Sequence, residues 1–312
     1  MTKKTKTSNS YLLTKVNEEF VLTSIGLPEL PSKIYGDLQG ATDRILTTFK
    51  DRDRNLGVLF SGLKGNSKTV TSLNVCKEFG GKVILITEPF TGDKFKEFLY
   101  QEKEECIIFI DEFEKIYNTT ELQDEFLTIL DGVFGGKKLF LFTSNSSQIS
   151  RYLINRPNRI YYHFKYDNIE ESVLNEIIKE ELKYPEFEIE LRDIILILGS
   201  VSYDVILNLI SEVNRFKKSP KELVKELNIQ VEQTNFTVVL LLNGKRFTAT
   251  IEYNPLTSEY FSISYKDENG HYRYFHDSVK QYTMYPYKGS FVFENEKNKL
   301  IFTPFKPYKF IL

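Results

Sequence analysis

The sequence has few of the residues on which disulfide scaffolds and zinc sites depend. It contains two cysteines, Cys76 and Cys106, and three histidines in 312 residues. Two cysteines cannot build a disulfide framework, and so few histidines argue against a zinc site. We therefore expect a protein of a reducing compartment, the cytoplasm.

Long apolar runs and a large charge of one sign are also missing. No stretch of about 18 apolar residues occurs, so we predict no membrane span and no membrane partner. The first residues, "MTKKTKTSNSYLL", are polar and basic and lack the apolar core of a signal peptide. The formal net charge is −2, so the overall charge does not indicate a nucleic-acid binder. This total does not exclude a locally basic surface.

The composition that is present is that of an ordinary globular protein. Hydrophobic residues make up 41% of the chain and charged residues 27%. A chain of 312 residues is long enough for two or three domains, each with its own core. We find no internal repeat and no low-complexity segment.

Changes in the residue pattern along the sequence divide the chain into four parts. Residues 1–30 are predicted to form a mobile or loosely attached N-terminal arm. In residues 31–166, short apolar runs alternate with helix-like stretches, which predicts an α/β subdomain with a parallel sheet. Apolar residues at helical spacing in 167–228 predict a small helical subdomain, and alternating runs separated by Asn-Gly turns in 229–312 predict a β-rich C-terminal domain.

The predicted strands of the parallel sheet share one feature. They are rich in Val, Ile, Leu and Phe without alternation, as strands buried on both faces require. The five candidates are "LGVLFSG", "KVILIT", "CIIFID", "KKLFLFTSN" and "RIYYHFKY".

A glycine turn follows the first of these strands and leads into a predicted helix, within "VLFSGLKGNSKTVTSLNV". A loop that wraps phosphate needs inward-facing N–H groups, a lysine for the β and γ phosphates and a hydroxyl for Mg²⁺. Gly62, Gly65, Lys68 and Thr69 occupy those places. The N-terminus of the following helix adds its own attraction for anions.

Ser67 stands where the last glycine of such a loop is usual. Glycine is favoured there because the loop is tight and its backbone passes close to phosphate. A serine would cost roughly 1 kcal/mol of strain, so we predict that Ser67 modifies a nucleotide site without abolishing it. The predicted binding stretch also includes Asn66 and Val70. Taken alone, the motif is equally explained by a chance glycine turn.

Two carboxylates end a later strand in "ECIIFIDEFEKIY". Phosphoryl transfer to water needs a carboxylate near Mg²⁺ and a base that polarises the attacking water. Asp111 suits the first role, with Thr69 as the second Mg²⁺ ligand, and Glu112 suits the second role. The alternative is an acidic strand end that faces solvent.

Polar and basic residues follow the next strand. Asn145 ends a strand predicted to lie beside that of Asp111, where an amide can hold the attacking water or contact the γ phosphate; the alternative is a turn residue. Arg156 and Arg159 flank Pro157 in "RYLINRPNRIYYHF". An arginine that reaches the γ phosphate of a neighbouring subunit stabilises transition-state charge, whereas the alternative is two surface arginines.

In this order and spacing, the motifs from about Ile34 to Arg215 resemble AAA+ ATPases. The segment "LDGVF…KKLFLFTSNSSQISRYLINRPNRIYYHF" is similar to the second region of homology of the AAA clade, with Asn158 in place of the usual glycine. The lid segment "GSVSYDVILNLI" lacks a second sensor arginine, as does the AAA clade. A narrower similarity is to ATPases of large tailed bacteriophages, which would act in the host cytoplasm.

The resemblance implies an α/β P-loop NTPase core with a small helical lid, followed here by the β-rich C-terminal domain. It implies ATP and Mg²⁺ as cofactors and a homo-oligomeric ring, usually of six subunits, with ATP bound between them. The residues implied to act in cis are Lys68, Thr69, Asp111, Glu112 and Asn145. Arg156 and Arg159 would act on the neighbour's nucleotide.

Two further segments take roles from the resemblance. Ile34, Tyr35 and Gly36 stand where the family packs its chain against adenine. Phe90 of "EPFTGDKF" stands where AAA remodelling machines carry an aromatic residue that grips substrate in the pore. The alternative for Phe90 is a buried side chain in an ordinary loop.

The work that such a ring performs is open to three interpretations. The first is a remodeller or translocase of a protein or complex, with an unknown protein bound through the C-terminal domain. The second is a nucleic-acid-associated ATPase, such as a loader or replication accessory, and the third is an assembly scaffold with a structural nucleotide. Aromatic residues of the C-terminal domain could stack on bases or form a core and a protein-binding rim. Because its charges nearly balance, nucleic acid is the less favoured partner.

Overall fold

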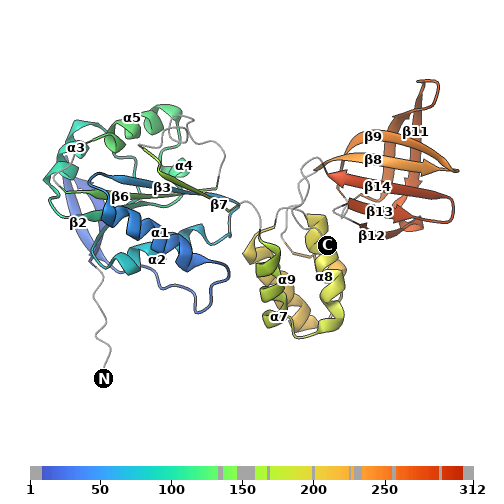
Figure 1. Cartoon of the computed structure of the whole chain (residues 1–312), viewed down its shortest axis with the longest axis horizontal. Coiled ribbons are helices and arrows are strands. Elements are labelled where there is room, and N and C mark those ends of the chain that lie inside the picture. The colour runs from blue at the N-terminus through green and yellow to red at the C-terminus, as the bar shows by residue number, and fades with distance from the viewer. Residues whose placement is uncertain are drawn as a thin grey trace. The chain divides into compact units, whose positions relative to one another are not determined.

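The computed structural model describes residues 9–132, 136–145, 159–166, 169–198, 201–224, 226–227, 234–254, 258–287 and 290–304. The chain divides into two compact units, Met1–Asp167 and Asn168–Leu312, and each is described by itself (Figure 1).

The first unit is built on a seven-stranded, mostly parallel sheet with the order β2-β1-β4-β5-β6-β3-β7. All five predicted strands are confirmed. They are β3 (Leu56–Gly62), β4 (Lys82–Ile86), β5 (Cys106–Ile110), β6 (Lys138–Ser144) and β7 (Tyr162–Tyr166). These five strands run parallel to their neighbours, so the carboxyl ends of β5, β6 and β3 lie side by side at one edge of the sheet.

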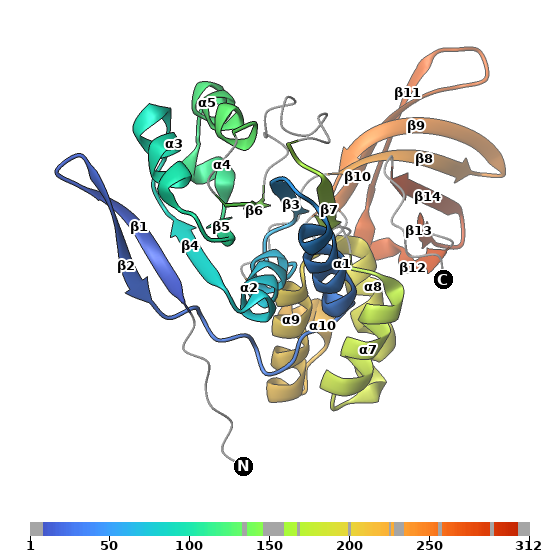
Figure 2. The same ribbon diagram turned by 60° about the vertical axis from the view of Figure 1, so that its left-hand side comes forward.

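Helices cover both faces of this sheet (Figure 2). On one face are α1 (Leu38–Asp51) and α2 (Lys68–Phe79). On the other are α3 (Gly92–Gln101), α4 (Phe113–Ile116) and α5 (Thr120–Leu130). Successive residues of a strand point to opposite faces of the sheet and belong to different hydrophobic clusters. In β3, Phe60 packs in the cluster on the α1–α2 face, and Leu59 packs in the cluster on the α3–α5 face. Both faces are buried, which explains the continuous apolar runs.

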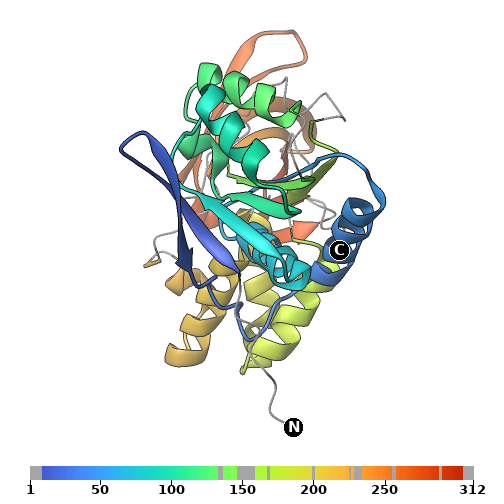
Figure 3. The same cartoon turned by 90° about the vertical axis from the view of Figure 1, so that its left-hand side faces the viewer.

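The prediction of a mobile or loosely attached N-terminal arm in residues 1–30 is wrong for the part that the structure describes. Strands β1 (Ser10–Val16) and β2 (Glu19–Ile25) form an antiparallel hairpin, and β1 pairs in parallel with β4 (Figures 2 and 3). A two-residue turn with positive φ at Asn17 (49°) and Glu18 (67°) closes it. Leu13 is fully buried and holds the hairpin to the core.

The second unit begins with helices, as the periodicity predicts. They are α7 (Glu171–Glu181), α8 (Glu188–Leu198) after a short 3₁₀ turn (η1, Pro185–Phe187), α9 (Tyr203–Phe216) and α10 (Pro220–Leu223). Their apolar faces bury Leu174, Ile177, Leu191, Leu209 and Ile210. None of the described helices in either unit has the length and apolar character that crossing a membrane would demand.

Strands make up the rest of the second unit, which is β-rich as predicted. A five-stranded antiparallel sheet has the order β12-β13-β14-β8-β9, and β10 pairs with β11 in a separate hairpin. The strands are β8 (Thr234–Leu242), β9 (Lys245–Tyr253), β10 (Tyr260–Lys266), β11 (Tyr272–Ser278), β12 (Thr283–Tyr287), β13 (Ser290–Glu294) and β14 (Asn298–Pro304), with a 3₁₀ turn (η2, Val279–Gln281) before β12. The predicted Asn243-Gly244 turn joins β8 to β9, with φ of 49° and 79°.

Candidate nucleotide-binding site

The loop between β3 and α2 has the backbone geometry of an anion cradle. Gly62, Gly65 and Ser67 have φ values of 136°, 79° and 59°. Successive turns of this kind bring several backbone N–H groups toward one concavity, which suits phosphate. Ser67 is the residue just before α2 and makes no side-chain capping bond, so it holds a glycine-type conformation without compensation from its hydroxyl.

The carbonyl of Tyr166, at the end of β7, holds this loop in place. It accepts hydrogen bonds from Leu63 N (3.1 Å) and Asn66 Nδ2 (2.8 Å). A Cβ added at Gly62 would lie 2.3 Å from the same oxygen, so only glycine fits there. Asn66 is buried, and its side chain braces the loop from behind. Sequence reasoning missed Tyr166, because a backbone acceptor leaves no signature in the sequence.

Lys68 and Thr69 open helix α2. Lys68 is buried, and its Nζ donates to the carbonyl oxygens of Gly62 (3.0 Å) and Leu63 (2.5 Å), so the amine lies across the loop. Val70 follows in the first turn of α2 and is half-buried. The lysine is therefore at the position where a phosphate-bearing ligand of this loop would need a cation.

The Thr69 hydroxyl meets the first carboxylate of the predicted pair. Thr69 Oγ1 donates to Asp111 Oδ1 at 2.8 Å, and Thr143 Oγ1 donates to the same oxygen at 2.5 Å. A hydroxyl and a carboxylate are oxygen ligands of the kind Mg²⁺ takes, usually one or two from protein and the rest from phosphate and water. Among the described residues, no three or more His, Cys, Asp or Glu side chains gather as a metal site. The donor set thus fits a Mg²⁺ ion shared with phosphate.

Glu112 is held at three points. Its backbone N donates to Thr143 Oγ1 (2.8 Å), while its Oε1 accepts from Asn145 Nδ2 (2.7 Å) and its Oε2 lies 2.6 Å from Lys115 Nζ. The hydrogen bond from Lys115 is the main reason that the pKa of Glu112 is lowered, with a smaller contribution from Asn145. Glu112 has a φ of 51°, so the backbone leaves the extended conformation of β5 at this residue. The carboxylate is consequently ionised at neutral pH and fixed in direction.

Asn145 lies at the carboxyl end of β6, beside β5, where it was predicted. Its backbone N donates to Glu114 Oε1 at 2.9 Å. The structure therefore brings together all five residues predicted to act in cis, from three separate segments of the chain: Lys68, Thr69, Asp111, Glu112 and Asn145. Thr143 and Lys115 join them and were not predicted, since a lone threonine within a strand and a lysine on a short helix carry no recognisable pattern.

Arg159 is not part of this cluster in its own chain. Its Nε donates to both carboxylate oxygens of Asp131 at 3.0 Å, and its side chain is 12% exposed. The bond to Asp131 raises its pKa further. Its carbonyl lies against Gly57 at the amino end of β3, roughly 16 Å along that strand from the loop at about 3.3 Å per residue. Arg156 lies outside the described residues.

The segment Ile34–Gly36 leads into α1. Tyr35 is buried with Lys33 Nζ 4.9 Å from its ring centroid, and Gly36 has a φ of 86°. The next residue, Asp37, caps α1 by accepting from Gly40 N at 2.8 Å. Burial, and more weakly the charge of Asp37, raises the pKa of Tyr166.

The predicted pore-loop role of Phe90 is wrong for this structure. Phe90 is 6% exposed and packs in the core, with ring centroids 5.2 Å from Phe20 and 5.9 Å from Phe95. A ring that grips a passing substrate must reach solvent. The alternative, a buried phenylalanine in an ordinary loop, is confirmed, and its cover comes from Phe20 of the hairpin that the sequence analysis did not predict.

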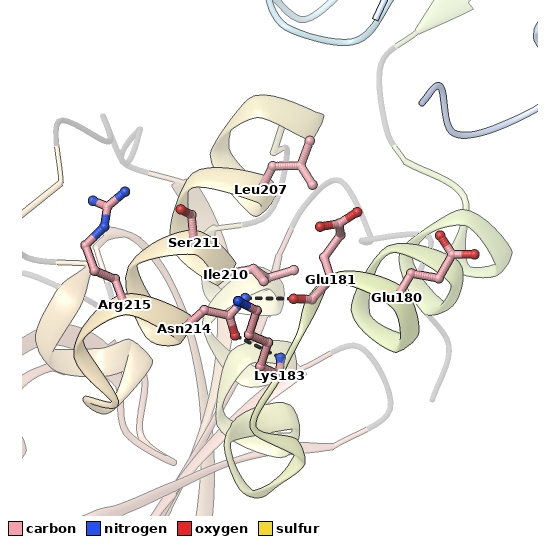
Figure 4. A pocket seen from close by; sticks show the side chains of 8 residues that line it. All are labelled: Glu180, Glu181, Lys183, Leu207, Ile210, Ser211, Asn214 and Arg215. Carbon is pink, nitrogen blue, oxygen red and sulfur yellow. Dashed lines mark hydrogen bonds between the residues drawn. The ribbon is translucent and has the colours of Figure 1, made fainter. Parts of the chain in front are cut away.

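The second unit has a surface pocket between α7 and α9 (Figure 4). Asn214 Nδ2 donates to Glu181 O (2.7 Å), and its Oδ1 accepts from Lys183 N (2.8 Å). The side chain thereby satisfies backbone groups where α7 ends. Arg215 at the rim pairs with Glu212. These bonds give Asn214 and Arg215 a structural role.

Together, the mostly parallel sheet and the loop at the end of β3 fit the core of a P-loop NTPase. Residues 58–168 match the family described as "ATPase family associated with various cellular activities (AAA)". The match runs from β3 to β7 and so includes the loop, both carboxylates and Asn145, which supports an AAA+ ATPase domain in this part of the chain. A search of curated proteins found no match.

Proposed function

We propose that this protein binds ATP with Mg²⁺ in the loop between β3 and α2 and hydrolyses it there. The observation that carries the proposal is the 2.8 Å hydrogen bond between Thr69 and Asp111, which are 42 residues apart in sequence and meet beside Lys68. A phosphate loop, a hydroxyl and a strand-end carboxylate converge at one point, as nucleotide hydrolysis requires.

Each side chain then has a defined task. The loop N–H groups and Lys68 bind the phosphates, while Thr69 and Asp111 hold the metal. Bound Mg²⁺ supplies charge neutralisation on the β and γ phosphates. Glu112 orients the attacking water and polarises it, and Asn145 fixes the direction of the Glu112 carboxylate. Thr143 positions both acidic residues through a single hydroxyl.

We further propose that the chain works as a ring, most simply a hexamer, in which Arg156 and Arg159 act on the neighbour's nucleotide. Two observations support this. The AAA match brings the expectation of ring assembly. Arg159 also lies at the amino end of β3, away from the phosphate loop of its own subunit. It can therefore contact only the ATP of another subunit, and to do so its side chain must give up its bond to Asp131.

The proposed work of the ring is to remodel or translocate a protein or complex, through a partner bound by the second unit. Burial of Phe90 removes the residue that pointed to threading through a pore. A nucleic-acid-associated ATPase is the second candidate, favoured by the exposed tyrosines of the second unit. The scaffold interpretation and the narrower similarity to phage ATPases stay predictions.

ATP hydrolysis by the purified full-length chain tests the central proposal. We expect Mg²⁺-dependent hydrolysis that Lys68→Ala abolishes together with ATP binding, whereas Glu112→Gln abolishes hydrolysis and retains binding. Lys77→Ala, at the exposed end of α2, and Glu121→Gln, at the start of α5, are the matched controls. Wild-type protein that neither retains nor cleaves ATP would refute the proposal. Mass measurement with and without ATP tests the ring separately.

A further inference from the structure

The β10–β11 hairpin of the second unit has two chemically different faces. The inner face buries Phe261 and Ile263, and Phe261 packs 5.0 Å from Phe293 in the domain core. The outer face is exposed. By strand alternation and pairing register, it carries Tyr260, Ser262, Ser264 and Lys266 from β10, and Tyr272, Tyr274 and His276 from β11. Figures 1 and 2 show the hairpin extending beyond the five-stranded sheet.

Tyrosines are unusually accessible on this outer face. Tyr260, Tyr272 and Tyr274 are 53%, 74% and 66% exposed. They are three of the nine large hydrophobic side chains that are exposed among the described residues, and the other six lie outside this hairpin. Single exposed aromatic residues are ordinary, but several gathered on one face mark a binding surface.

The rings are ordered relative to one another. The His276 ring lies between Tyr260 (centroids 5.3 Å apart, planes at 9°) and Tyr274 (6.2 Å, 9°). A hydrogen bond of 3.1 Å between Ser262 Oγ and His276 Nδ1 fixes the histidine. Next along the strand, Lys266 Nζ lies 5.1 Å from the ring centroid of Tyr272. The face is thus a preformed row of near-parallel rings with a cation at one end.

Charge on this face favours an anionic, planar ligand. Lys266 is the one fully charged side chain on the outer face of the two strands as described. Two carboxylates close to this face are engaged, since Asp267 accepts from Arg273 Nε (2.9 Å) and Asp277 accepts from the Tyr282 hydroxyl (2.8 Å). No carboxylate of the two strands therefore opposes a phosphate over the rings. The serine hydroxyls add neutral hydrogen-bonding groups.

We propose that this outer face binds single-stranded nucleic acid, with bases stacked on the tyrosine and histidine rings and Lys266 contacting a phosphate. Unpaired bases offer free ring faces to aromatic side chains, whereas bases in a duplex stack on each other. From Tyr272 to His276 the strand spans roughly 13 Å at about 3.3 Å per residue. That length suits two or three bases, the number that aromatic residues on a sheet surface commonly stack. The surface belongs to the second unit and does not depend on ATP hydrolysis.

One cation and several aromatic rings predict binding that depends more on base stacking than on charge. The logarithm of the affinity should fall with the logarithm of salt concentration with a slope of about −0.7 per phosphate contacted, hence a shallow dependence. Removing one ring should weaken binding by about 5- to 150-fold, the range measured for stacking on single aromatic residues. Sequence preference should be small, because every base has a stacking face.

Fluorescence anisotropy of a labelled oligothymidylate, titrated with the full-length chain, tests the proposal. We expect Tyr274→Ala to weaken binding by the factor above and Tyr274→Phe to retain it. Tyr100→Ala is the matched control, because Tyr100 on α3 is 55% exposed and also has a lysine, Lys103, over its ring at 4.4 Å. Lys68→Ala should bind the oligonucleotide normally, which separates this surface from the ATP site.

Several results would overturn the proposal. They are absence of binding, equal binding of a matched duplex, or equal affinity of the Tyr274→Ala and Tyr100→Ala proteins. Tyr272→Ala, at the most exposed of the three rings, repeats the test should Tyr274→Ala alter the melting curve of the domain. A surface that serves a protein partner instead would leave the oligonucleotide unbound, and this result counts against the proposal.

Discussion

Lys115 Nζ lies 2.6 Å from Oε2 of Glu112, the carboxylate proposed to polarise water. The two residues are three positions apart, at the start of the short helix α4. The pair lowers the pKa of Glu112 and raises that of Lys115. A carboxylate with a lowered pKa stays ionised to lower pH, but it is also a weaker base.

We therefore predict that Lys115→Gln changes the pH dependence of hydrolysis. Without the cation, the pKa of Glu112 rises toward its usual value, so the acidic limb of the kcat profile should move to higher pH. At neutral pH, kcat should rise by about two- to fivefold, because a stronger base accepts the proton more readily. Lys96→Gln is the control, since Lys96 pairs with Asp93 at the same spacing on α3. An unchanged profile would mean that Lys115 is only a surface ion pair.

Ser67→Gly should relieve backbone strain at the loop. Serine at a φ of 59° costs about 1 kcal/mol or more relative to glycine, and the hydroxyl caps nothing in return. We expect a higher free energy of unfolding and tighter ATP binding, measured by chemical denaturation and by titration calorimetry. Lys217→Gly, at a φ of 51° after α9, should raise stability without changing ATP affinity. Weaker ATP binding by Ser67→Gly would show that the serine itself contacts the nucleotide.

Thr143→Val should separate the two acidic residues from their common hydroxyl. Valine has the shape of threonine but leaves the Glu112 N–H and the Asp111 carboxylate without that partner, at a cost of about 1–3 kcal/mol. We expect kcat to fall by about tenfold or more and the Mg²⁺ requirement to rise. Thr143→Ser should restore both. Thr128→Val on α5, where the hydroxyl bonds only Glu125 O, should change neither.

Gly62→Ala should disrupt the contact between the loop and β7. Its Cβ would lie 2.3 Å from Tyr166 O, and its φ of 136° disfavours any side chain. We predict destabilisation by several kcal/mol together with loss of ATP binding, read by thermal melting and nucleotide titration. Gly26→Ala is the control, because nothing lies within 4 Å of a Cβ there. Normal ATP affinity in Gly62→Ala would contradict the bracing role of Tyr166.

Residue patterns predicted the parts of the fold that local chemistry determines. The five parallel strands are apolar throughout because both faces are buried, and their adjacency brings Asp111 and Asn145 to one edge. The hairpin of residues 10–25 was missed because β2 is largely exposed and its Asn17-Glu18 turn lacks glycine. The error about Phe90 follows directly, since its burial depends on Phe20, 70 positions earlier in the chain.

The sequence predicts those site residues that belong to a recognisable motif. Lys68, Thr69 and Asp111 have one. Thr143 has none, because its role comes from register against β5, and Lys115 acts through a neighbour on its own helical turn. Arg159 could be noticed as an arginine near a proline, but its bond to Asp131 depends on tertiary contact.

The Tyr166 carbonyl has a mechanical consequence. It is bonded to Leu63 and Asn66 of the phosphate loop, and the second unit begins two residues later, at Asn168. A turn of the loop backbone would either move the last peptide of β7 or break these bonds. The phosphate loop and the end of β7 are thus mechanically linked within the first unit by two hydrogen bonds to one carbonyl.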